Sequence, residues 1–276
     1  MNPGTFLVDA TRDEERFRVK SLLHVGRSYQ IVLAEDTHLE GKIVCVKAIL
    51  YDNDLLNDVE YVKGRRQALR DEMEFLTLKS PLLPDPVDWI EIADSPVGLG
   101  NEPILVYEYQ HGPTLYELIE ERHPHGLAPL RALRIFGAIA RFLGDIHEAG
   151  YVFRDLDPRH IIVGLDDIIH VTGCGNATKM GERPNIYKSE LNFAYVAPEI
   201  RNETSGQMLR RAADVYALGA LMSFMLTGEE PRASVENPLT KDAFDDLSNT
   251  EPPGISLLVA RCLQPLAKNR FTHVRK

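Results

Sequence analysis

The stretch "FRDLDPRH" places two carboxylates and an imidazole close together, at Asp155, Asp157 and His160. A carboxylate that is held in position can accept a proton from a substrate hydroxyl, which makes Asp155 a candidate catalytic base. Two carboxylates with one imidazole can also form a donor set for a divalent metal ion. A third interpretation is that Asp155 only braces its own loop. The sequence alone leaves all three open.

The composition argues against several classes of function. The chain has 276 residues and a formal net charge of -10, whereas a general nucleic-acid binder needs clustered Lys and Arg. Cys45, Cys174 and Cys262 show no CxxC spacing, which disfavours a zinc site and favours a reducing compartment, the cytoplasm. The most apolar run, from Val215 to Leu226, is shorter than the about 20 residues of a bilayer crossing, so we expect a buried helix and no membrane segment in this chain.

The first hundred residues have the alternation of strands. Short β-branched runs bounded by turn residues predict strands in "FRVKSLL", "QIVLAED", "KIVCVKAIL", "PVDWIEI" and "PILVYEY". Between the third and fourth runs, "RRQALRDEMEFLTL" predicts one helix, with Leu69, Met73 and Leu76 on its buried stripe and Glu72 beside that stripe. These elements predict a five-stranded antiparallel sheet with one main helix.

The remainder of the chain has mostly helical patterns. "LRALRIFGAIARFLGDIHEAG" repeats apolar residues at helical spacing from Leu130 to Ile146 and reaches Gly150, which is placed to end the helix. Two short strands, "HIIVG" and "IIHVTG", come next, followed by a long loop, the apolar helix before Gly228, and a helix in "ISLLVARCL". The whole pattern predicts an α+β, bilobal fold with a sheet lobe at 1–108, a helical lobe at 109–276 and a crevice at their junction.

Seven motifs in a fixed order cover nearly the whole chain. They are "VCVK" with Lys47, "RDEMEFL" with Glu72, "VYEYQHG", "FRDLDPRH", "YVAPE" from Tyr195 to Glu199, "DVYALG" from Asp214, and "PLAKNRF" with Arg270. In this order they resemble a protein kinase domain of the bacterial eukaryote-like Ser/Thr type. The resemblance implies the bilobal kinase fold, an ion pair between Glu199 and Arg270, and a catalytic loop braced by Asp214.

The same resemblance implies ATP as the nucleotide and assigns the site residues. Lys47, held by Glu72, matches the lysine that meets the α and β phosphates, and Asp155 matches the base for a substrate hydroxyl. These three are the catalytic candidates. The positions that match nucleotide-binding residues of the family are Gly26, Ile31, Cys45, Lys47, Tyr107, Glu108, Tyr109, Gln110 and Ile162, with Tyr107 as gatekeeper.

Several functional residues of the family are replaced. The two positions that hold magnesium read His160 and Gly173, and neither suits a hard cation that prefers oxygen ligands. Asp157 stands where the family has a lysine. This reverses a charge contact of about 4 kcal/mol at roughly 4 Å for an effective dielectric near 20. The resemblance therefore assigns no metal ligand and does not favour bound Mg or Mn.

Other replacements change the shape of the predicted site. His24 and Tyr29 take the outer glycine positions of the loop that covers the phosphates, so that only Gly26 remains. Asn192 replaces the threonine that braces the catalytic aspartate, and it keeps the capacity to hydrogen-bond. Cys174 replaces a phenylalanine of the apolar column that links the lobes, so we expect a looser regulatory helix.

These features together predict a pseudokinase, a bacterial signalling module or scaffold that binds ATP, a protein partner or both without ordinary magnesium-dependent phosphoryl transfer. A protein partner would dock on the helical lobe or on the activation segment between Gly173 and Glu199.

Two alternatives stay open beside the pseudokinase. One is an active, atypical Ser/Thr kinase that uses Asp155 with a non-standard metal site and offers Thr178 and Ser189 for phosphorylation, with Arg154 as the partner of the phosphate. The other is a pure scaffold that binds no nucleotide. A small-molecule phosphotransferase is disfavoured, because such enzymes usually lack the segment that "YVAPE" matches.

Overall fold

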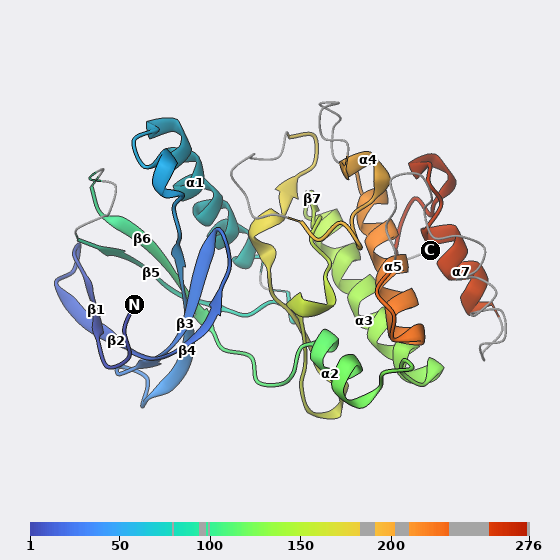
Figure 1. The fold of residues 1–276 in the computed structure, drawn as a ribbon, viewed down its shortest axis with the longest axis horizontal. Helices are drawn as coiled ribbons and strands as arrows, with labels where there is room; N and C mark the ends of the chain where they lie inside the picture. Colours follow the sequence, from blue (N-terminus) through green and yellow to red (C-terminus); the bar gives the residue numbers. More distant parts are fainter. Residues whose placement is uncertain are drawn as a thin grey trace. The chain divides into compact units, whose positions relative to one another are not determined.

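The computed structural model describes residues 1–78, 80–93, 98, 100–182, 191–201, 210–231 and 254–274. They belong to two compact units (Figure 1). The first takes in the described residues of Met1–Lys79 and Leu83–Gln110, and the second takes in those of Ser80–Leu82, His111–Pro184 and Glu190–Lys276. Strands dominate the first unit and helices the second, so the α+β class is confirmed.

The first unit is built on a six-stranded antiparallel sheet with the order β1-β2-β3-β4-β6-β5. The strands are β1 (Phe6–Asp9), β2 (Glu14–Val25), β3 (Tyr29–Asp36), β4 (Lys42–Ile49), β5 (Pro86–Ile92) and β6 (Glu102–Glu108). The sequence pattern predicts five of them. It does not predict β1, because four residues after a Pro-Gly turn are too few to establish an alternation.

The sheet curls until its two edge strands meet. The N–H of Ala10, just after β1, donates to the carbonyl of Glu91 in β5 at 2.7 Å. The inner face of the curled sheet buries an apolar core of Leu7, Phe17, Val19, Val32, Ala34, Val44, Val46, Ala48, Ile90, Ile104 and Val106. Because β1 covers one side of this core, the first residues of the chain are part of the folded unit.

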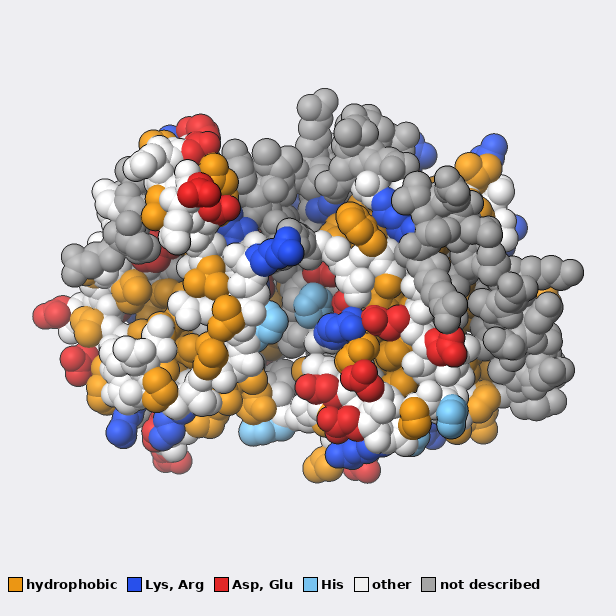
Figure 2. Space-filling view, in the orientation of Figure 1, with side chains coloured by type: hydrophobic (Ala, Val, Ile, Leu, Met, Phe, Trp, Pro, Cys, Tyr) orange, Lys and Arg blue, Asp and Glu red, His pale blue; other side chains and the backbone are white. Residues whose placement is uncertain are grey.

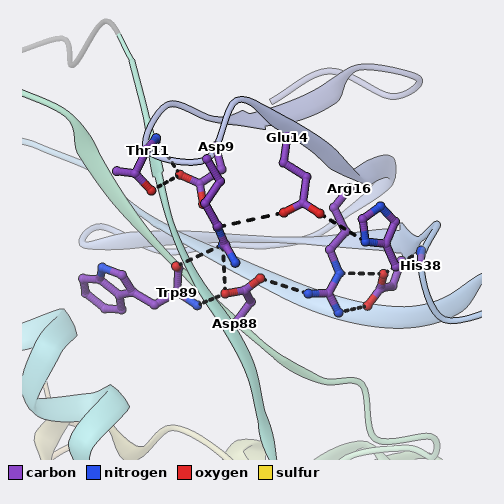
Figure 3. A network of polar contacts seen from close by, with 9 residues as sticks. Asp9, Thr11, Glu14, Arg16, His38, Asp88 and Trp89 are labelled. Atoms are coloured by element: carbon purple, nitrogen blue, oxygen red, sulfur yellow. Dashed lines mark hydrogen bonds and ion pairs between the residues drawn. The ribbon is translucent and has the colours of Figure 1, made fainter.

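A network of charged side chains fastens the closed edge of the sheet (Figure 3). Arg16 donates to both carboxylate oxygens of Asp36, at 2.9 and 2.6 Å, and to Asp88 at 3.0 Å. Arg12 reaches the other oxygen of Asp88 at 3.0 Å. Burial opposes ionisation of Asp36, but the hydrogen bonds from Arg16 and from the N–H of His38 hold the pKa of Asp36 below its ordinary value.

Helix α1 (Val59–Leu76) packs against β4 and β6. Asp58 caps its first turn by accepting from the backbone N–H groups of Glu60 and Tyr61. Its buried residues are Val62, Arg65, Ala68, Leu69, Glu72, Phe75 and Leu76. The predicted placement of Glu72 beside the stripe is therefore wrong: this carboxylate lies on the buried face, where a cationic partner from the sheet compensates its charge.

The second unit is built on the helices α2 (Leu115–Arg122), α3 (Pro129–Glu148), α4 (Pro198–Arg201), α5 (Ala212–Thr227) and α7 (Ile255–Cys262). Helix α5 contacts both α3 and α7 and is buried on nearly all sides, as its apolar sequence predicts. It ends at Gly228, which has a φ of +74°. Helix α3 ends before Gly150, as predicted, but Leu130 in its first turn is exposed rather than part of the buried face.

Two small ladders shape the loops of the second unit. Strand β7 (Tyr151–Val152) pairs with β10 (Thr178–Lys179), and β8 (Ile161–Val163) pairs with β9 (Ile169–Val171). Both pairs are antiparallel, and the predicted strands "HIIVG" and "IIHVTG" correspond to the second. None of the helices in the described part of the chain has the length and apolar character that spanning a membrane requires.

Candidate functional site

One face of the first unit's sheet carries four of the nine predicted nucleotide-binding residues. Lys47 in β4 lies directly opposite Ile31 in β3, and Cys45 lies directly opposite Tyr107 in β6. Directly opposed residues of antiparallel strands share a face, and so do residues two apart in one strand. Ile31, Cys45, Lys47 and Tyr107 are therefore neighbours on one surface.

The Cys45 thiol belongs to this face, and the end of β6 continues the chain beyond Tyr107. Burial raises the pKa of the Cys45 thiol to about 12, against a hydrogen bond with Tyr107 that lowers it, so Cys45 is an inert apolar group rather than a nucleophile. Glu108, Tyr109 and Gln110 are half-buried. The N–H of Glu108 donates to the carbonyl of Asp85 at 3.0 Å.

Lys47 and Glu72 form a buried ion pair. The Lys47 ammonium donates to the two carboxylate oxygens of Glu72 at 2.8 and 2.7 Å, and the two residues are only 6% and 4% exposed. The partnership implied by the family resemblance is thus present in the first unit. The expected loosening of the regulatory helix is wrong there, because α1 carries Glu72 into direct contact with β4.

Further polar contacts fasten α1 to the sheet. Arg66 donates to the buried carboxylate of Glu102 in β6 at 2.8 Å, and the hydroxyl of Tyr51 donates to the same carboxylate at 2.7 Å. Arg65, also in α1, donates to the backbone carbonyl of Ser28 in the turn before β3. These contacts fasten α1 to the sheet within the first unit.

Tyr29 occupies the space next to the Lys47 ammonium. The Lys47 nitrogen lies 4.2 Å from the centroid of the Tyr29 ring, and the guanidinium carbon of Arg65 lies 4.6 Å from it. Tyr29 is 5% exposed. Burial, together with the negative charge of Glu72, raises the pKa of its hydroxyl.

The sequence could have revealed this role of Tyr29. Tyr29 is two residues before Ile31 in a strand, so the period of two places both on the face that carries Lys47. The remaining loop glycine, Gly26, hydrogen-bonds through its N–H to the Tyr29 carbonyl at 2.9 Å.

In the second unit, Asp214 braces the loop that carries Asp155. Its carboxylate accepts from the backbone N–H groups of Phe153 and Arg154, both at 2.8 Å, and lies 2.7 Å from the ring nitrogen Nε2 of His147. Arg154 has a φ of +71°, a conformation that L-residues adopt rarely and that these bonds stabilise. The predicted role of Asp214 is confirmed.

Asp155 is buried among polar neighbours. The side-chain amide of Asn176 donates to it at 2.9 Å, and the Nδ1 atom of His160 lies 3.6 Å from the same oxygen. Burial raises the pKa of Asp155, while His160 and Asn176 oppose that shift. Asn176 could not be predicted as a partner of Asp155, because it stands where no motif assigns a polar group.

Asp157 has its own set of donors. Asn192 donates to it at 2.7 Å, and the N–H of Arg159 does so at 2.8 Å. Asn192 therefore keeps its hydrogen-bonding capacity, as predicted, but the acceptor of its side-chain N–H is Asp157.

Ile162, the predicted adenine neighbour in the second unit, lies in β8 and is half-buried.

His160 and Gly173 lie against each other. The backbone N–H of Thr172 donates to the His160 carbonyl at 2.7 Å, which brings the two chain segments together. A Cβ atom built on Gly173 would lie 2.5 Å from both Cγ and Nδ1 of the imidazole. Gly173 also has a φ of +70°, where glycine is favoured.

These side chains do not fit a magnesium site. Position 173 offers no ligand and His160 offers a nitrogen, whereas Mg²⁺ takes oxygen ligands in octahedral geometry. Within the described ranges, no three His, Cys, Asp or Glu side chains are arranged to hold a metal ion. The alternative of a metal cluster formed by Asp155, Asp157 and His160 is therefore wrong.

Of the two predicted phosphorylation sites, Thr178 and Ser189, the structure describes Thr178. Thr178 is buried in β10, and its hydroxyl donates to the carbonyl of Asn176 at 3.1 Å, so it is not an accessible phosphate acceptor. Ser189 lies outside the described residues.

Arg270 and Glu199 form the predicted ion pair. The guanidinium donates to the two carboxylate oxygens at 2.6 and 2.8 Å and also to the carbonyl of Ala212, the first residue of α5, at 2.8 Å. Arg270 is 2% exposed. The pair joins α4, the start of α5 and the chain after α7, which is a structural role.

A family model of the protein kinase domain matches residues 21–274. The chain belongs to the protein kinase domain family. This kinase domain is 28% identical over 222 residues to the serine/threonine-protein kinase PknB of Mycolicibacterium smegmatis, an alignment that covers 79% of this chain and 33% of the relative. It is also 28% identical to the serine/threonine-protein kinase PrkC of Bacillus subtilis over 221 residues, which covers 78% of this chain and 31% of the relative.

A solved structure shows the same fold. The kinase domain of PknI from Mycobacterium tuberculosis superimposes with a TM-score of 0.70 at 20% identity, over 100% of this chain and 95% of that one. The bilobal protein kinase fold predicted from the motifs is thereby confirmed. This kinase domain spans about a third of the length of PknB and PrkC.

Proposed function

We propose that this kinase domain is a pseudokinase that binds ATP or a protein partner and does not carry out ordinary magnesium-dependent phosphoryl transfer. The observation that carries the proposal is the contact between Gly173 and His160. The family's two metal-holding positions are these two residues, and the imidazole fills the space into which a carboxylate at 173 would project.

The charges around Asp155 support the same proposal. Asp157 stands at the position where the family has a lysine that steadies the transferring phosphate. Its carboxylate is buried and accepts a hydrogen bond from Asn192. A second negative charge here repels a transferring phosphate. Asp155 is then best explained as a carboxylate that braces its loop, with Asn176 as its partner.

Retained residues of the first unit support nucleotide binding. Ile31, Cys45 and Tyr107 share one sheet face, and their apolar surfaces suit a flat heterocycle. A nucleotide or a protein partner that binds one existing conformation more tightly would increase the population of that conformation. A kinase domain without catalysis could signal through such a change in conformation.

Thermal-shift titration tests the proposal. We expect ATP to raise the melting temperature by the same amount in EDTA as with excess Mg²⁺, because the second unit does not supply the metal's ligands. A matched variant, Cys45→Trp, fills the proposed base surface and abolishes the shift. No shift in the wild type under either condition would favour a pure scaffold.

The active-kinase alternative has its own test. Incubation with radiolabelled ATP and either Mg²⁺ or Mn²⁺ is expected to give no incorporation into the domain itself or into a general protein substrate. Incorporation that Asp155→Asn abolishes would establish an atypical Ser/Thr kinase instead.

The setting and the partner are also part of the proposal. Cys45, Cys174 and Cys262 are all buried free thiols, which supports a reducing, cytoplasmic location.

A protein partner would dock on the helical unit or on the activation segment. Pull-down with the second unit's surface blocked by a bound antibody fragment would test this assignment.

A further inference from the structure

We infer that Tyr29 takes the place of the nucleotide's phosphates at Lys47, so that this kinase domain recognises an adenine nucleoside and gains nothing from the phosphate chain. The inference rests on the proposed nucleotide binding and names the class of ligand. It concerns residues of the first unit only.

The strand register explains why Tyr29 reaches Lys47. Tyr29 lies opposite Ile49 in the β3–β4 ladder, and Ile31 lies opposite Lys47. Tyr29 and Lys47 are therefore diagonal neighbours on one sheet face, a separation that an aromatic side chain spans. The phenol ring covers the ammonium at 4.2 Å.

Glu72 and Tyr29 together cover the Lys47 ammonium. A lysine ammonium has three N–H groups. Two are directed to the carboxylate oxygens of Glu72, at 2.8 and 2.7 Å, and the electron-rich ring of Tyr29 lies over the nitrogen. Lys47 is 6% exposed, so a phosphate could approach it only after the ring had moved away.

A second cation holds the ring in this position. The guanidinium carbon of Arg65 lies 4.6 Å from the ring centroid, and Arg65 also donates to the carbonyl of Ser28, the residue before Tyr29. Both the side chain and the backbone of this segment are thus fastened to α1. Displacement of Tyr29 would remove the aromatic contact of two buried cations at once.

Isothermal titration in EDTA with ATP, ADP and adenosine tests the consequence. We expect the three to bind the wild type with dissociation constants within about threefold of each other, because a charge-assisted hydrogen bond to phosphate would separate them by tenfold or more. In Tyr29→Ala, ATP is expected to bind about tenfold more tightly than adenosine. Tyr29→Phe keeps the ring and loses only a hydroxyl that has no hydrogen-bond partner among the residues the structure describes, so it is expected to show no preference for ATP.

Acylation of lysines, read by mass spectrometry, tests the position of the ring without any nucleotide. Lys20 and Lys42, whose side chains are 46% and 47% exposed, serve as internal references. We expect Lys47 to react slowly in the wild type and in Tyr29→Phe, and faster in Tyr29→Ala. If that variant does not fold, Tyr29→Leu keeps an apolar side chain in place and is expected to show the same increase to a smaller extent.

The two experiments separate the inference from the proposed function. If no ligand binds the wild type, the proposed nucleotide binding fails, while the acylation rates still show whether Tyr29 covers Lys47. Equal acylation of Lys47 with and without the ring would overturn the inference. So would a wild type that binds ATP at least tenfold more tightly than adenosine and in which ATP, but not adenosine, protects Lys47 from acylation.

Discussion

The His160 imidazole fills the space in which a side chain at Gly173 would begin, with Cγ and Nδ1 both 2.5 Å from the position of a Cβ atom. The two replacements at the family's metal-holding positions are therefore not independent. A large ring at one position is accommodated because the other has no side chain, and reverting either one alone leaves the site incomplete.

Gly173→Asp is expected to destabilise the domain by about 1–3 kcal/mol, the usual cost of overpacking, and to give no Mg²⁺-dependent stabilisation by ATP. Gly173→Asp combined with His160→Asn should recover most of that stability, because the smaller amide makes room for the carboxylate. Thermal melts with and without ATP and Mg²⁺ measure both effects.

Gly181→Asp is the matched control for this change. Gly181 has a φ of +83°, similar to that of Gly173, but a Cβ atom there meets nothing within 4 Å. It therefore carries the backbone cost of an aspartate without the collision. Equal destabilisation by the two aspartates would show that His160 is not the obstacle.

Asp155→Asn is expected to raise stability at pH 7 by on the order of 1 kcal/mol, because burial disfavours the charged carboxylate and the neutral amide keeps the shape of the side chain. Burial raises the pKa of Asp155, so the folded state binds its proton more tightly than the unfolded state. Stability from this group is present at low pH and is lost as the pH rises through the folded pKa. The asparagine still accepts from Asn176.

Differential scanning calorimetry from pH 3 to pH 7 would follow this difference. The gain from Asp155→Asn should shrink towards acid pH, where the wild-type carboxyl is already neutral. Asp166→Asn, at an exposed position of the same unit, should show no such trend. A lower melting temperature for Asp155→Asn at pH 7 would contradict the expected cost.

Lys47→Met should destabilise the domain by about 3–5 kcal/mol, because it leaves the Glu72 carboxylate buried without a counter-charge. Lys47→Met with Glu72→Met should recover much of the loss, since two apolar side chains of similar length replace the pair. Urea denaturation of the single and double variants measures the coupling. Strictly additive losses would mean that the pair is not the source of the effect.

Arg16→Gln should cost about 2–3 kcal/mol at pH 7, because Asp36 is fully buried and loses both bonds to the guanidinium. The pKa of Asp36 is lowered in the folded state. Its stabilising contribution is therefore present above the unfolded pKa and is lost as the pH falls through the folded pKa.

The loss from Arg16→Gln should accordingly diminish in acid, as followed by thermal melts between pH 2 and pH 7. Lys20→Gln provides the comparison, because the Lys20–Glu35 pair is exposed to water and such pairs contribute little. If the two substitutions had equal effects, the network in Figure 3 would not stabilise the sheet.

Much of the fold could be predicted from the sequence because periodicity and motif order agree. The residues of β5, the end of α5 at Gly228 and the Arg270–Glu199 pair lie where the patterns place them. Strand β1 could not be predicted, since it is too short to show a period. Its pairing depends on the long β2, which lies further along the chain.

The site was harder to predict because some replaced residues fit together only in three dimensions, as the His160 ring fits beside Gly173. The motifs predict the Lys47–Glu72 pair, but the helix pattern alone places Glu72 beside the buried stripe, and Tyr29 is predicted only as a replaced glycine until the ladder shows it beside Lys47. The bond from Asn176 to Asp155 follows from loop geometry that no spacing rule describes. Residue identity showed which family groups are missing, whereas the structure shows what has taken their space.

Strand β1 and the first half of β2 complete the curled sheet and contribute Leu7, Phe17 and Val19 to its apolar core. A domain cut at the limits of the family match, residues 21–274, would start inside β2 and lose β1 together with Phe17 and Val19. Hydrophobic side chains are already exposed on this unit (Figure 2). Leu22, Leu23 and Val25 in β2 are exposed apolar residues of this kind. Such a trimmed protein would present unpaired backbone beside apolar surface and would be prone to aggregate, so the sequence-family limits are not the limits of the foldable unit.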